Sequence, residues 1–123
     1  MRDVLLDTNF LTAPFQMNIS IFEEIDEKYP GNKVFTLDRV VEEAKSIEDG
    51  KYGGLIEKLI ESEGVQVLKT EGNGFVDDLL VDLSDEFLIA TNDRELKNSI
   101  LEKGRPVMYI RSKSHIVVEN EDF

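Results

Sequence analysis

Two acidic residues stand directly behind short apolar runs of the sequence. Asp7 follows the run at 3–6, and Asp93 follows the run at 86–90 after two polar residues. A short apolar run that ends in polar residues is typical of a buried strand in a parallel sheet. Such sheets bind their ligands at the carboxyl ends of the strands, so we expect Asp7 and Asp93 to lie close together at that edge.

Two further acidic positions fall on predicted helices. Glu43 lies in a helix expected over 37–47, at the border of its apolar stripe. Asp77 and its neighbour Asp78 open a helix expected over 76–83, just after a glycine-rich loop. In a sheet with helices on both faces, these positions can converge on the same edge as the first two acids.

Carboxylates that meet in space repel one another, so either their pKa values rise or a cation neutralises them. The chain has no cysteine, and its one histidine, His115, lies near the C-terminus. Oxygen ligands without nitrogen or sulfur favour Mg²⁺ or Mn²⁺, and one or two such ions can activate a water and bridge a phosphodiester. The sequence therefore predicts a hard-cation site built from Asp7, Glu43, Asp77 and Asp93.

Each acid also has a purely structural explanation. Asp93 could cap the last helix, and Asp77 could lie favourably at the positive end of a helix dipole. Glu43 could be solvated like its neighbour Glu42. Asp7 is harder to explain in this way, because a carboxylate at the end of a buried strand loses hydration unless something compensates.

The elements that would position these acids alternate between strands and helices. Strands are expected at 3–6, 33–36, 65–68, 86–90 and 107–110, with a last edge strand at 115–118, and helices at 18–28, 37–47, 55–63, 76–83 and 93–103. This alternation predicts an α/β fold with a parallel sheet between two layers of helices, in a single domain over 1–123. Asn18 is expected to cap its helix, and Leu55 is expected to be buried on the apolar face of the helix that it begins.

The composition limits the possible function classes. The 14 basic and 26 acidic residues give a net charge of −12, which argues against non-specific binding to polyanions and to anionic membranes. No apolar run approaches the ~18–20 residues that a bilayer-spanning helix needs. Acidic residues interrupt the N-terminal segment too early for a secretory signal, so we expect a cytoplasmic protein. The absence of cysteine excludes disulfides and thiolate chemistry.

Four segments together resemble the motifs of one nuclease family. They are Val4–Asn9 (VLLDTN), Val40–Ala44 (VVEEA), Phe75–Leu80 (FVDDLL) and Ala90–Leu96 (ATNDREL), and the ending Pro106–Ile110 (PVMYI) adds to them. Their order and positions resemble those of PIN-domain ribonucleases, in particular rRNA-processing nucleases and archaeal VapC-like relatives. The resemblance runs from Val4 to about Val118.

The resemblance implies a three-layer α/β/α sandwich around a mostly parallel sheet of about five strands. It also implies Mg²⁺- or Mn²⁺-dependent hydrolysis of RNA that leaves a 5′-phosphate and a 3′-hydroxyl. Asp7, Asp77 and Asp93 would hold the metal directly or through water. Glu43 would hold metal or orient the nucleophilic water.

Three neighbouring residues complete the implied site. Asn9 and Thr91 would support it by hydrogen bonds, although both are also ordinary turn residues. Asp78 would replace Asp77 as the ligand if the alignment is displaced by one residue.

RNA binding needs cationic contacts, which are sparse in so acidic a chain. The candidates are Arg39, Arg94 and Lys97 at the expected edge of the site, and Arg105, Arg111 and Lys113 near the C-terminus. Each of them could simply be solvated. The acidity indicates that a partner or a folded RNA in a larger particle contributes substrate affinity, and the resemblance implies a homodimer.

Several functions fit this pattern. A toxin would cleave a defined RNA and be silenced by an antitoxin, whereas a processing factor would cut precursor RNA within a ribosome-assembly particle. A PIN-like domain could also bind RNA or protein without catalysis. A phosphoacceptor receiver domain, also α/β and Mg²⁺-binding, needs an aspartate at the end of its third strand, where this chain has Leu68, Lys69 and Thr70.

Overall fold

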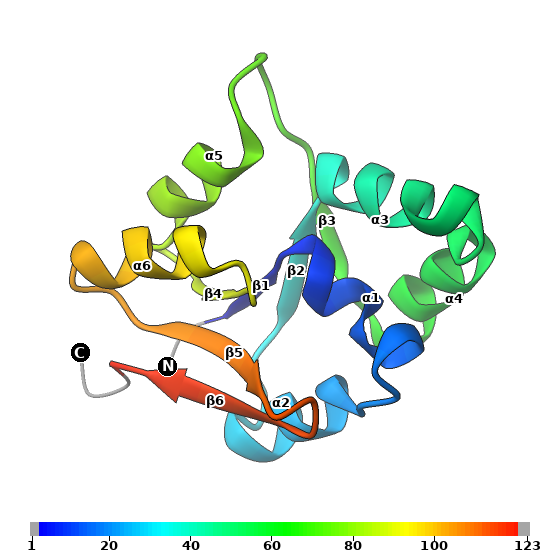
Figure 1. Cartoon of the computed structure of the whole chain (residues 1–123), viewed down its shortest axis with the longest axis horizontal. Coiled ribbons are helices and arrows are strands. Elements are labelled where there is room, and N and C mark those ends of the chain that lie inside the picture. Colours follow the sequence, from blue (N-terminus) through cyan, green and yellow to red (C-terminus); the bar gives the residue numbers. More distant parts are fainter. Residues whose placement is uncertain (1–2, 121–123) are drawn as a thin grey trace.

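A computed structural model describes residues 3–120 of the chain, so the predicted domain limits, 1 and 123, lie outside the described residues. A six-stranded sheet runs through them in the order β3-β2-β1-β4-β5-β6 (Figure 1). The strands are β1 (Val4–Leu6), β2 (Val34–Leu37), β3 (Gln66–Leu68), β4 (Leu88–Ala90), β5 (Val107–Arg111) and β6 (His115–Glu119). The first five are parallel and β6 is antiparallel to β5. The predicted mostly parallel α/β class is confirmed, with the expected edge strand as a sixth member.

The helices of the described chain join these strands. They are α1 (Thr8–Gln16), α2 (Ile21–Lys28), α3 (Asp38–Gly50), α4 (Gly53–Glu63), α5 (Val76–Leu83) and α6 (Arg94–Glu102). Crossovers between parallel strands are right-handed, so the direction in which the chain moves along the sheet decides which face a helix covers. The chain moves from β1 through β2 to β3 by way of α1–α4, which therefore lie on one face. It then moves in the opposite direction to β4 and β5 by way of α5 and α6, which lie on the other face. In Figure 1, α5 and α6 lie together on the left, and α1, α3 and α4 lie on the right. Within residues 3–120, no helix combines the length and the apolar character needed to cross a bilayer.

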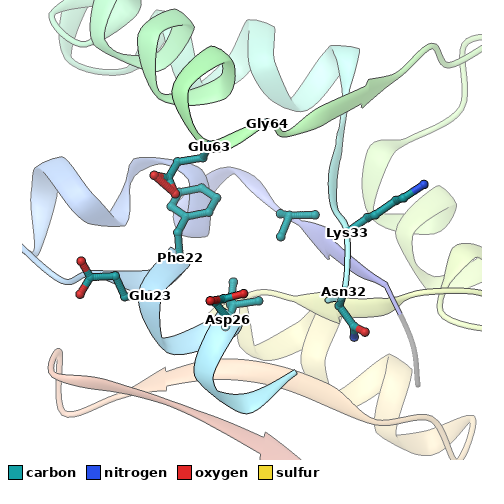
Figure 2. A pocket seen from close by; sticks show the side chains of 9 residues that line it. Phe22, Glu23, Asp26, Asn32, Lys33, Glu63 and Gly64 are labelled. Atoms are coloured by element: carbon teal, nitrogen blue, oxygen red, sulfur yellow. The ribbon is translucent and has the colours of Figure 1, made fainter. Parts of the chain in front are cut away.

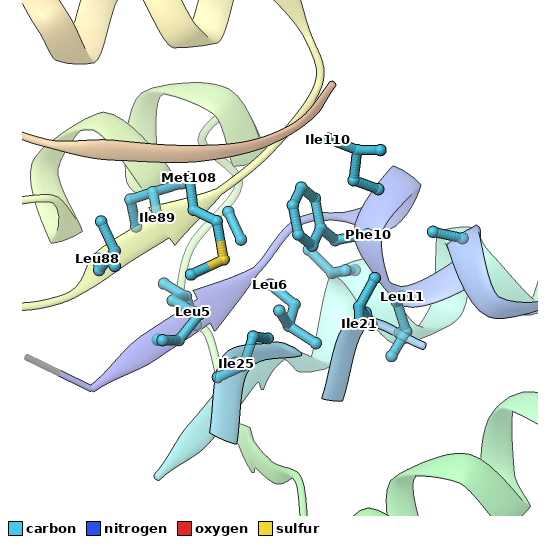
Figure 3. Packing of buried hydrophobic residues seen from close by; sticks show 14 of the residues in the cluster. Leu5, Leu6, Phe10, Leu11, Ile21, Ile25, Leu88, Ile89, Met108 and Ile110 are labelled. Atoms are coloured by element: carbon cyan, nitrogen blue, oxygen red, sulfur yellow. The ribbon is translucent and has the colours of Figure 1, made fainter. Parts of the chain in front are cut away.

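The core lies on both faces of the central strands. β1 (VLL) and β4 (LIA) are apolar throughout because helices cover both faces of a parallel sheet. Leu5, Leu6, Ile89 and Met108 are fully buried, together with Phe10 (Figure 3). Burying a side chain of this kind stabilises the fold by ~1.5–3 kcal/mol. This packing holds the ends of β1 and β4, behind which the predicted acids follow.

Helix α1 has no counterpart among the elements predicted from the sequence. Pro14 lies inside its nine residues, where proline removes a backbone hydrogen bond and lowers helix propensity. The Asp7 carboxylate caps α1 by accepting from Thr8 N, and Phe10 and Leu11 are fully buried. Tertiary burial therefore overrides local propensity in this segment.

Two local predictions are wrong. Asn18 does not cap α2, because the helix begins at Ile21 after Ser20, and Asn18 lies before it with a left-handed φ of 53°. Leu55 is not buried: 47% of its surface is exposed, whereas Ile56 is fully buried. Helix α4 turns only a narrow stripe to the core, so the apolar residue beside that stripe faces solvent.

The order of the strands reverses between β1 and β4. Open α/β sheets bind their ligands at such a switch point, beyond the carboxyl ends of the strands. Here the backbone bridges the two strand ends, since Asp7 N donates to Ala90 O at 2.9 Å. The residues that follow β1 and β4 are therefore the expected place for a ligand site.

Candidate active site

A cleft of about 330 Å³ lies beyond the carboxyl ends of β1 and β4. Its lining residues are Asp7, Thr8, Asn9, Gln16, Glu43, Ile47, Val76, Asp77 and Asp93. The four acids singled out in the sequence therefore share one cleft, although they come from distant parts of the chain. The switch point supplies two of them, and α3 and α5 supply one each.

Asp7 is the most buried of the four acids, with 7% of its surface exposed. Its Oδ1 accepts from Thr8 N at 2.8 Å, and its Oδ2 accepts from the Thr91 hydroxyl at 2.6 Å. Burial raises the pKa of Asp7, these two hydrogen bonds lower it, and the charges of Glu43 and Asp93 raise it again, with burial the largest cause. The fold thus holds this carboxylate in one orientation at an electrostatic cost.

Thr91 connects Asp7 to Asp93. Its side chain is fully buried, and its hydroxyl donates to Asp7 while accepting from Asp93 N at 3.1 Å. Asp93 in turn caps α6, because its Oδ1 accepts from Leu96 N at 3.0 Å. Asp93 therefore both caps the helix and lines the cleft, and its second oxygen has no donor among residues 3–120.

Asn9 ties the loop after β1 to the loop after β4. Its Oδ1 accepts from Asn92 N at 2.9 Å, and Asn92 Oδ1 accepts from Ile110 N of β5 at 2.7 Å. These two amides link the carboxyl ends of three neighbouring strands. Asn92 is a supporting residue that the sequence analysis missed, and its place between Thr91 and Asp93 was the available signal.

Asp77 lies in the first turn of α5 and lines the cleft, whereas its neighbour Asp78 does not. Desolvation raises the pKa of Asp77, and the charges of Asp7, Asp93, Asp78 and Glu95 raise it further. Asp77 is therefore close enough to the acids of the switch point to be repelled by them. This geometry favours Asp77 over Asp78 as the cleft residue of the pair.

Glu43 reaches the cleft from α3, and its charge raises the pKa of Asp7. Its neighbour Glu42 does not line the cleft. The helical backbone of α3 is interrupted at Ile47, where ψ is 142°, and Ile47 forms an apolar part of the cleft wall. Glu43, at the border of the apolar stripe of α3, is therefore solvent-exposed and also lines the cleft.

Two further cleft residues were not anticipated from the sequence. The Thr8 hydroxyl is buried and has no hydrogen-bond partner within the described part of the chain. Gln16 Oε1 accepts from the Thr12 hydroxyl at 2.9 Å. An unpaired buried hydroxyl costs roughly 1–3 kcal/mol, so Thr8 Oγ1 is a group available to a ligand or to water. Its position directly after Asp7 was the one signal for Thr8 in the sequence.

A hard divalent cation fits this site by the chemistry of its donors. Every ionisable side chain of the cleft is a carboxylate, and the unpaired Thr8 hydroxyl adds a neutral oxygen. Burial and, after it, repulsion from the neighbouring carboxylates raise the pKa values of Asp7 and Asp77, and a cation would offset both costs. Among residues 3–120, no three acidic or histidine side chains already stand at the distances of a formed metal site. The donors therefore fit by type and by their common cleft, and side-chain rotation would be needed to bring them onto one ion.

The cations proposed to contact RNA differ in their surroundings. Arg39 Nε donates to the Thr70 hydroxyl at 2.9 Å and its Nη1 donates to Gly74 O, so this side chain fastens the loop before α5. Arg105 Nε pairs with Asp85 at 2.8 Å. The remaining candidates, which have no carboxylate within ion-pair distance among the described residues, are Arg94, Lys97, Arg111 and Lys113.

A larger hollow, of about 390 Å³, lies away from these acids. Phe22, Glu23, Asp26, Lys33 and Glu63 are among its lining residues (Figure 2). It lies at the start of β2 and the end of α4, whereas sheets of this kind carry their ligand sites at the carboxyl ends of the strands. Size alone therefore does not identify the active site, and the acidic cleft is the better candidate.

Comparisons with known proteins agree with this geometry. A model of the PIN like domain family matches residues 4–113, which is most of the chain. The chain belongs to the PIN like domain family. Among solved structures, the PIN domain endonuclease Utp24 is similar, with 27% sequence identity and a TM-score of 0.78, over 96% of this chain and 91% of that chain. No match was found among curated proteins.

The resemblance to PIN domains is thereby confirmed, and the receiver-domain alternative is wrong. This PIN domain carries one cleft acid in each of the four segments on which the resemblance rested. The third strand, which would carry the phosphoacceptor of a receiver domain, ends in Leu68 without an acid.

Proposed function

We propose that this PIN domain is a divalent-metal-dependent endoribonuclease. The observation that carries the proposal is the convergence of Asp7, Glu43, Asp77 and Asp93 on one cleft at the switch point of the sheet. Membership of the family and similarity to a PIN domain endonuclease support a nuclease-type PIN domain. The proposal adds two properties to this assignment, namely that the activity depends on a metal ion and that the substrate is RNA.

In this proposal, Asp7, Asp77 and Asp93 would hold one or two Mg²⁺ or Mn²⁺ ions, directly or through water. An ion bound there would lower the pKa of a coordinated water and would offset charge on the phosphodiester. Glu43, which is the exposed acid of α3 in the cleft, holds metal or orients the attacking water. The hydrolysis leaves a 5′-phosphate and a 3′-hydroxyl.

Asn9 and Thr91 act as positioning residues in this mechanism. Thr91 holds the Asp7 carboxylate and the backbone of Asp93, and Asn9 holds the backbone of Asn92. The Asp7 carboxylate and the backbone of Asp93 are therefore already held in place at the two strand ends before a cation binds.

The partners belong to the same proposal. With a net charge of −12, the chain by itself binds an RNA polyanion weakly, and a protein partner or a ribosome-assembly particle adds affinity for the substrate. A processing factor acts within such a particle, whereas a toxin is silenced by an antitoxin peptide. A homodimer and a cytoplasmic location complete the proposal.

The test is incubation of the purified protein with mixed RNA and Mn²⁺, with and without EDTA. Wild-type protein should cleave, EDTA should stop the cleavage, and excess Mn²⁺ should restore it. Asp93→Asn should remove the activity while keeping the cap of α6, because asparagine caps helices as well as aspartate does. Glu102→Gln, which removes an exposed acid at the other end of α6, is the matched control and should cleave normally.

Two results would contradict the nuclease assignment. One is cleavage that survives both EDTA and Asp93→Asn, which would come from a contaminant. The other is binding of RNA or protein by a folded protein that does not cleave RNA in Mn²⁺. The chain would then be a PIN-like binding module without catalysis.

A further inference from the structure

Two cations converge on one aromatic ring beside the acidic cleft. Lys97 Nζ lies 3.9 Å from the centroid of the Tyr109 ring, and the guanidinium carbon of Arg111 lies 5.7 Å from it. Arg111 Nη2 also donates to the Tyr109 hydroxyl at 2.6 Å. We refer to Lys97, Tyr109 and Arg111 together as the Tyr109 site.

The Tyr109 site is connected to the acidic cleft through its own backbone elements. Lys97 N donates to Asp93 O at 2.9 Å, one turn into α6. Ile110 N, next to Tyr109 in β5, donates to Asn92 Oδ1 at 2.7 Å. Helix α6 packs on β5, as the ribbon in Figure 1 shows. The site is therefore held in a fixed relation to the loop that carries Asp93.

The charge of the Tyr109 site is unbalanced. Within residues 3–120, neither Lys97 nor Arg111 has a carboxylate within ion-pair distance, whereas Lys45, Lys103 and Arg105 do. The chain has 26 acidic residues against 14 basic ones, so carboxylates to pair with these cations are not scarce. Two like charges at one ring repel each other, and an anion between them would relieve that repulsion.

The donors of the Tyr109 site fit a phosphate group. Arg111 keeps N–H groups beyond the one that Tyr109 accepts, and its planar guanidinium suits phosphate oxygens. The Tyr109 hydroxyl accepts from Arg111, so its own hydrogen remains to be donated. Lys97 adds a mobile ammonium group. Lysine, arginine and tyrosine side chains are among the groups that contact nucleic-acid phosphates.

We propose that the Tyr109 site binds a backbone phosphate of the substrate, next to the one that is cleaved. The RNA strand then leaves the acidic cleft over α6 and β5, and not over α3. This inference rests on the proposed function for the identity of the ligand as RNA. Lys97 and Arg111 are substrate-binding residues in this arrangement and take no part in the bond cleavage.

The test measures binding of a fluorescein-labelled oligouridylate by anisotropy, in Mg²⁺ and in an Asp93→Asn background that prevents cleavage. Lys97→Gln and Arg111→Gln should each weaken binding about tenfold, since each removes a charged hydrogen bond to phosphate. Each should also reduce the slope of log K against log salt concentration by about 0.7, the share of one phosphate contact on a single strand. Lys58→Gln, on the exposed side of α4, removes the same charge far from the site and should change neither quantity.

Two conservative variants separate a binding role from a structural one. Lys97→Arg keeps the charge and should bind nearly as well as the parent protein. Tyr109→Phe keeps the ring but loses the hydroxyl, and should weaken binding a few-fold. Because Arg111 is exposed, water can replace the acceptor that it loses, so thermal stability should change little. Unchanged binding by all variants, equal weakening by Lys58→Gln, or no RNA binding by the parent protein would overturn the proposal.

Cleavage assays distinguish failure of this inference from failure of the proposed function. In the wild-type background, Lys97→Gln should raise KM and leave kcat unchanged. A fall in kcat with an unchanged KM would contradict the proposal that Lys97 only binds substrate. If wild-type protein binds RNA through these residues but does not cleave it, the nuclease function fails and the phosphate site stands. If cleavage is normal and the variants bind normally, the phosphate site alone fails.

Discussion

The Thr91 hydroxyl donates to Asp7 Oδ2 at 2.6 Å, joining two residues that are 84 positions apart in the chain. The same oxygen accepts from Asp93 N, so one hydroxyl sets the position of two cleft acids. Thr91 is fully buried, which leaves little room for a water to take over its role. Loss of this hydroxyl would leave a carboxylate oxygen of Asp7 without its donor in a poorly solvated place.

Thr91→Val should therefore affect both stability and activity. The free energy of unfolding should fall by ~1–3 kcal/mol, and cleavage should fall roughly 10–100-fold, as is usual when a residue that orients a metal ligand is lost. The Thr91 hydrogen bond lowers the pKa of Asp7, so its loss should move the acid limb of the pH–rate profile to higher pH. Urea unfolding and cleavage rates measure these effects. Thr91→Ser keeps the hydroxyl and should behave like wild type, and a fully active valine variant would show that the hydroxyl is dispensable.

The two roles of Asp93 can be separated by substitution. Asp93→Asn keeps the acceptor for Leu96 N and should unfold like wild type, whereas Asp93→Ala should lose ~1 kcal/mol of stability with the cap. Both variants should lose cleavage activity by roughly 100-fold or more if the second oxygen of Asp93 holds metal. Thermal melting measures the capping role and cleavage rates measure the metal-binding role, both on the same preparations. An active asparagine variant would leave capping as the sole function of Asp93.

Asp77→Asn should stabilise the metal-free protein at neutral pH. The fold raises the pKa of Asp77, so the ionised carboxylate disfavours folding, and its removal should raise Tm by roughly 1–4 °C after allowance for solvent screening. The difference should vanish as the pH falls below the ordinary value of 3.8, because Asp77 is then neutral in both the folded and the unfolded state.

Melting curves in EDTA and in Mn²⁺ measure the effect of Asp77→Asn and provide its control. Mn²⁺ should stabilise wild type more than the variant, since the variant has lost a ligand. Asp78→Asn removes the neighbouring charge, which does not line the cleft, and should retain the stabilisation by Mn²⁺. Equal stabilisation of Asp77→Asn and wild type by the metal would contradict the ligand role of Asp77.

Arg39→Ala should loosen the loop before α5. Arg39 donates to the Thr70 hydroxyl and to Gly74 O, and loss of these charged hydrogen bonds should increase opening of the loop on the order of tenfold or more. Trypsin cleavage after Lys69, which is exposed, reports this opening. Lys45→Ala removes a cation of α3 that pairs with Glu57 of α4 and should leave that cleavage unchanged. Unaltered proteolysis of Arg39→Ala would show that Arg39 is free to bind substrate instead.

Much of this architecture could be predicted from local sequence because burial leaves a local pattern. β1 and β4 are read as apolar runs, since both faces of the central strands are covered by helices. Helix α5 was predicted with its observed bounds, as a glycine-containing loop precedes its apolar periodicity. The positions of Asp7 and Asp93 directly behind central strands then follow from the rule that parallel strands end at one edge.

Other features depended on contacts between distant segments, and these leave no local pattern. Helix α1 forms despite Pro14 because its apolar side chains are buried by the rest of the molecule. The part played by Asn92 arises from partners 83 and 18 positions away. The cations could be separated into engaged and unpaired ones only from their neighbours in space, since charge and spacing do not specify which carboxylate or ring a long side chain will meet.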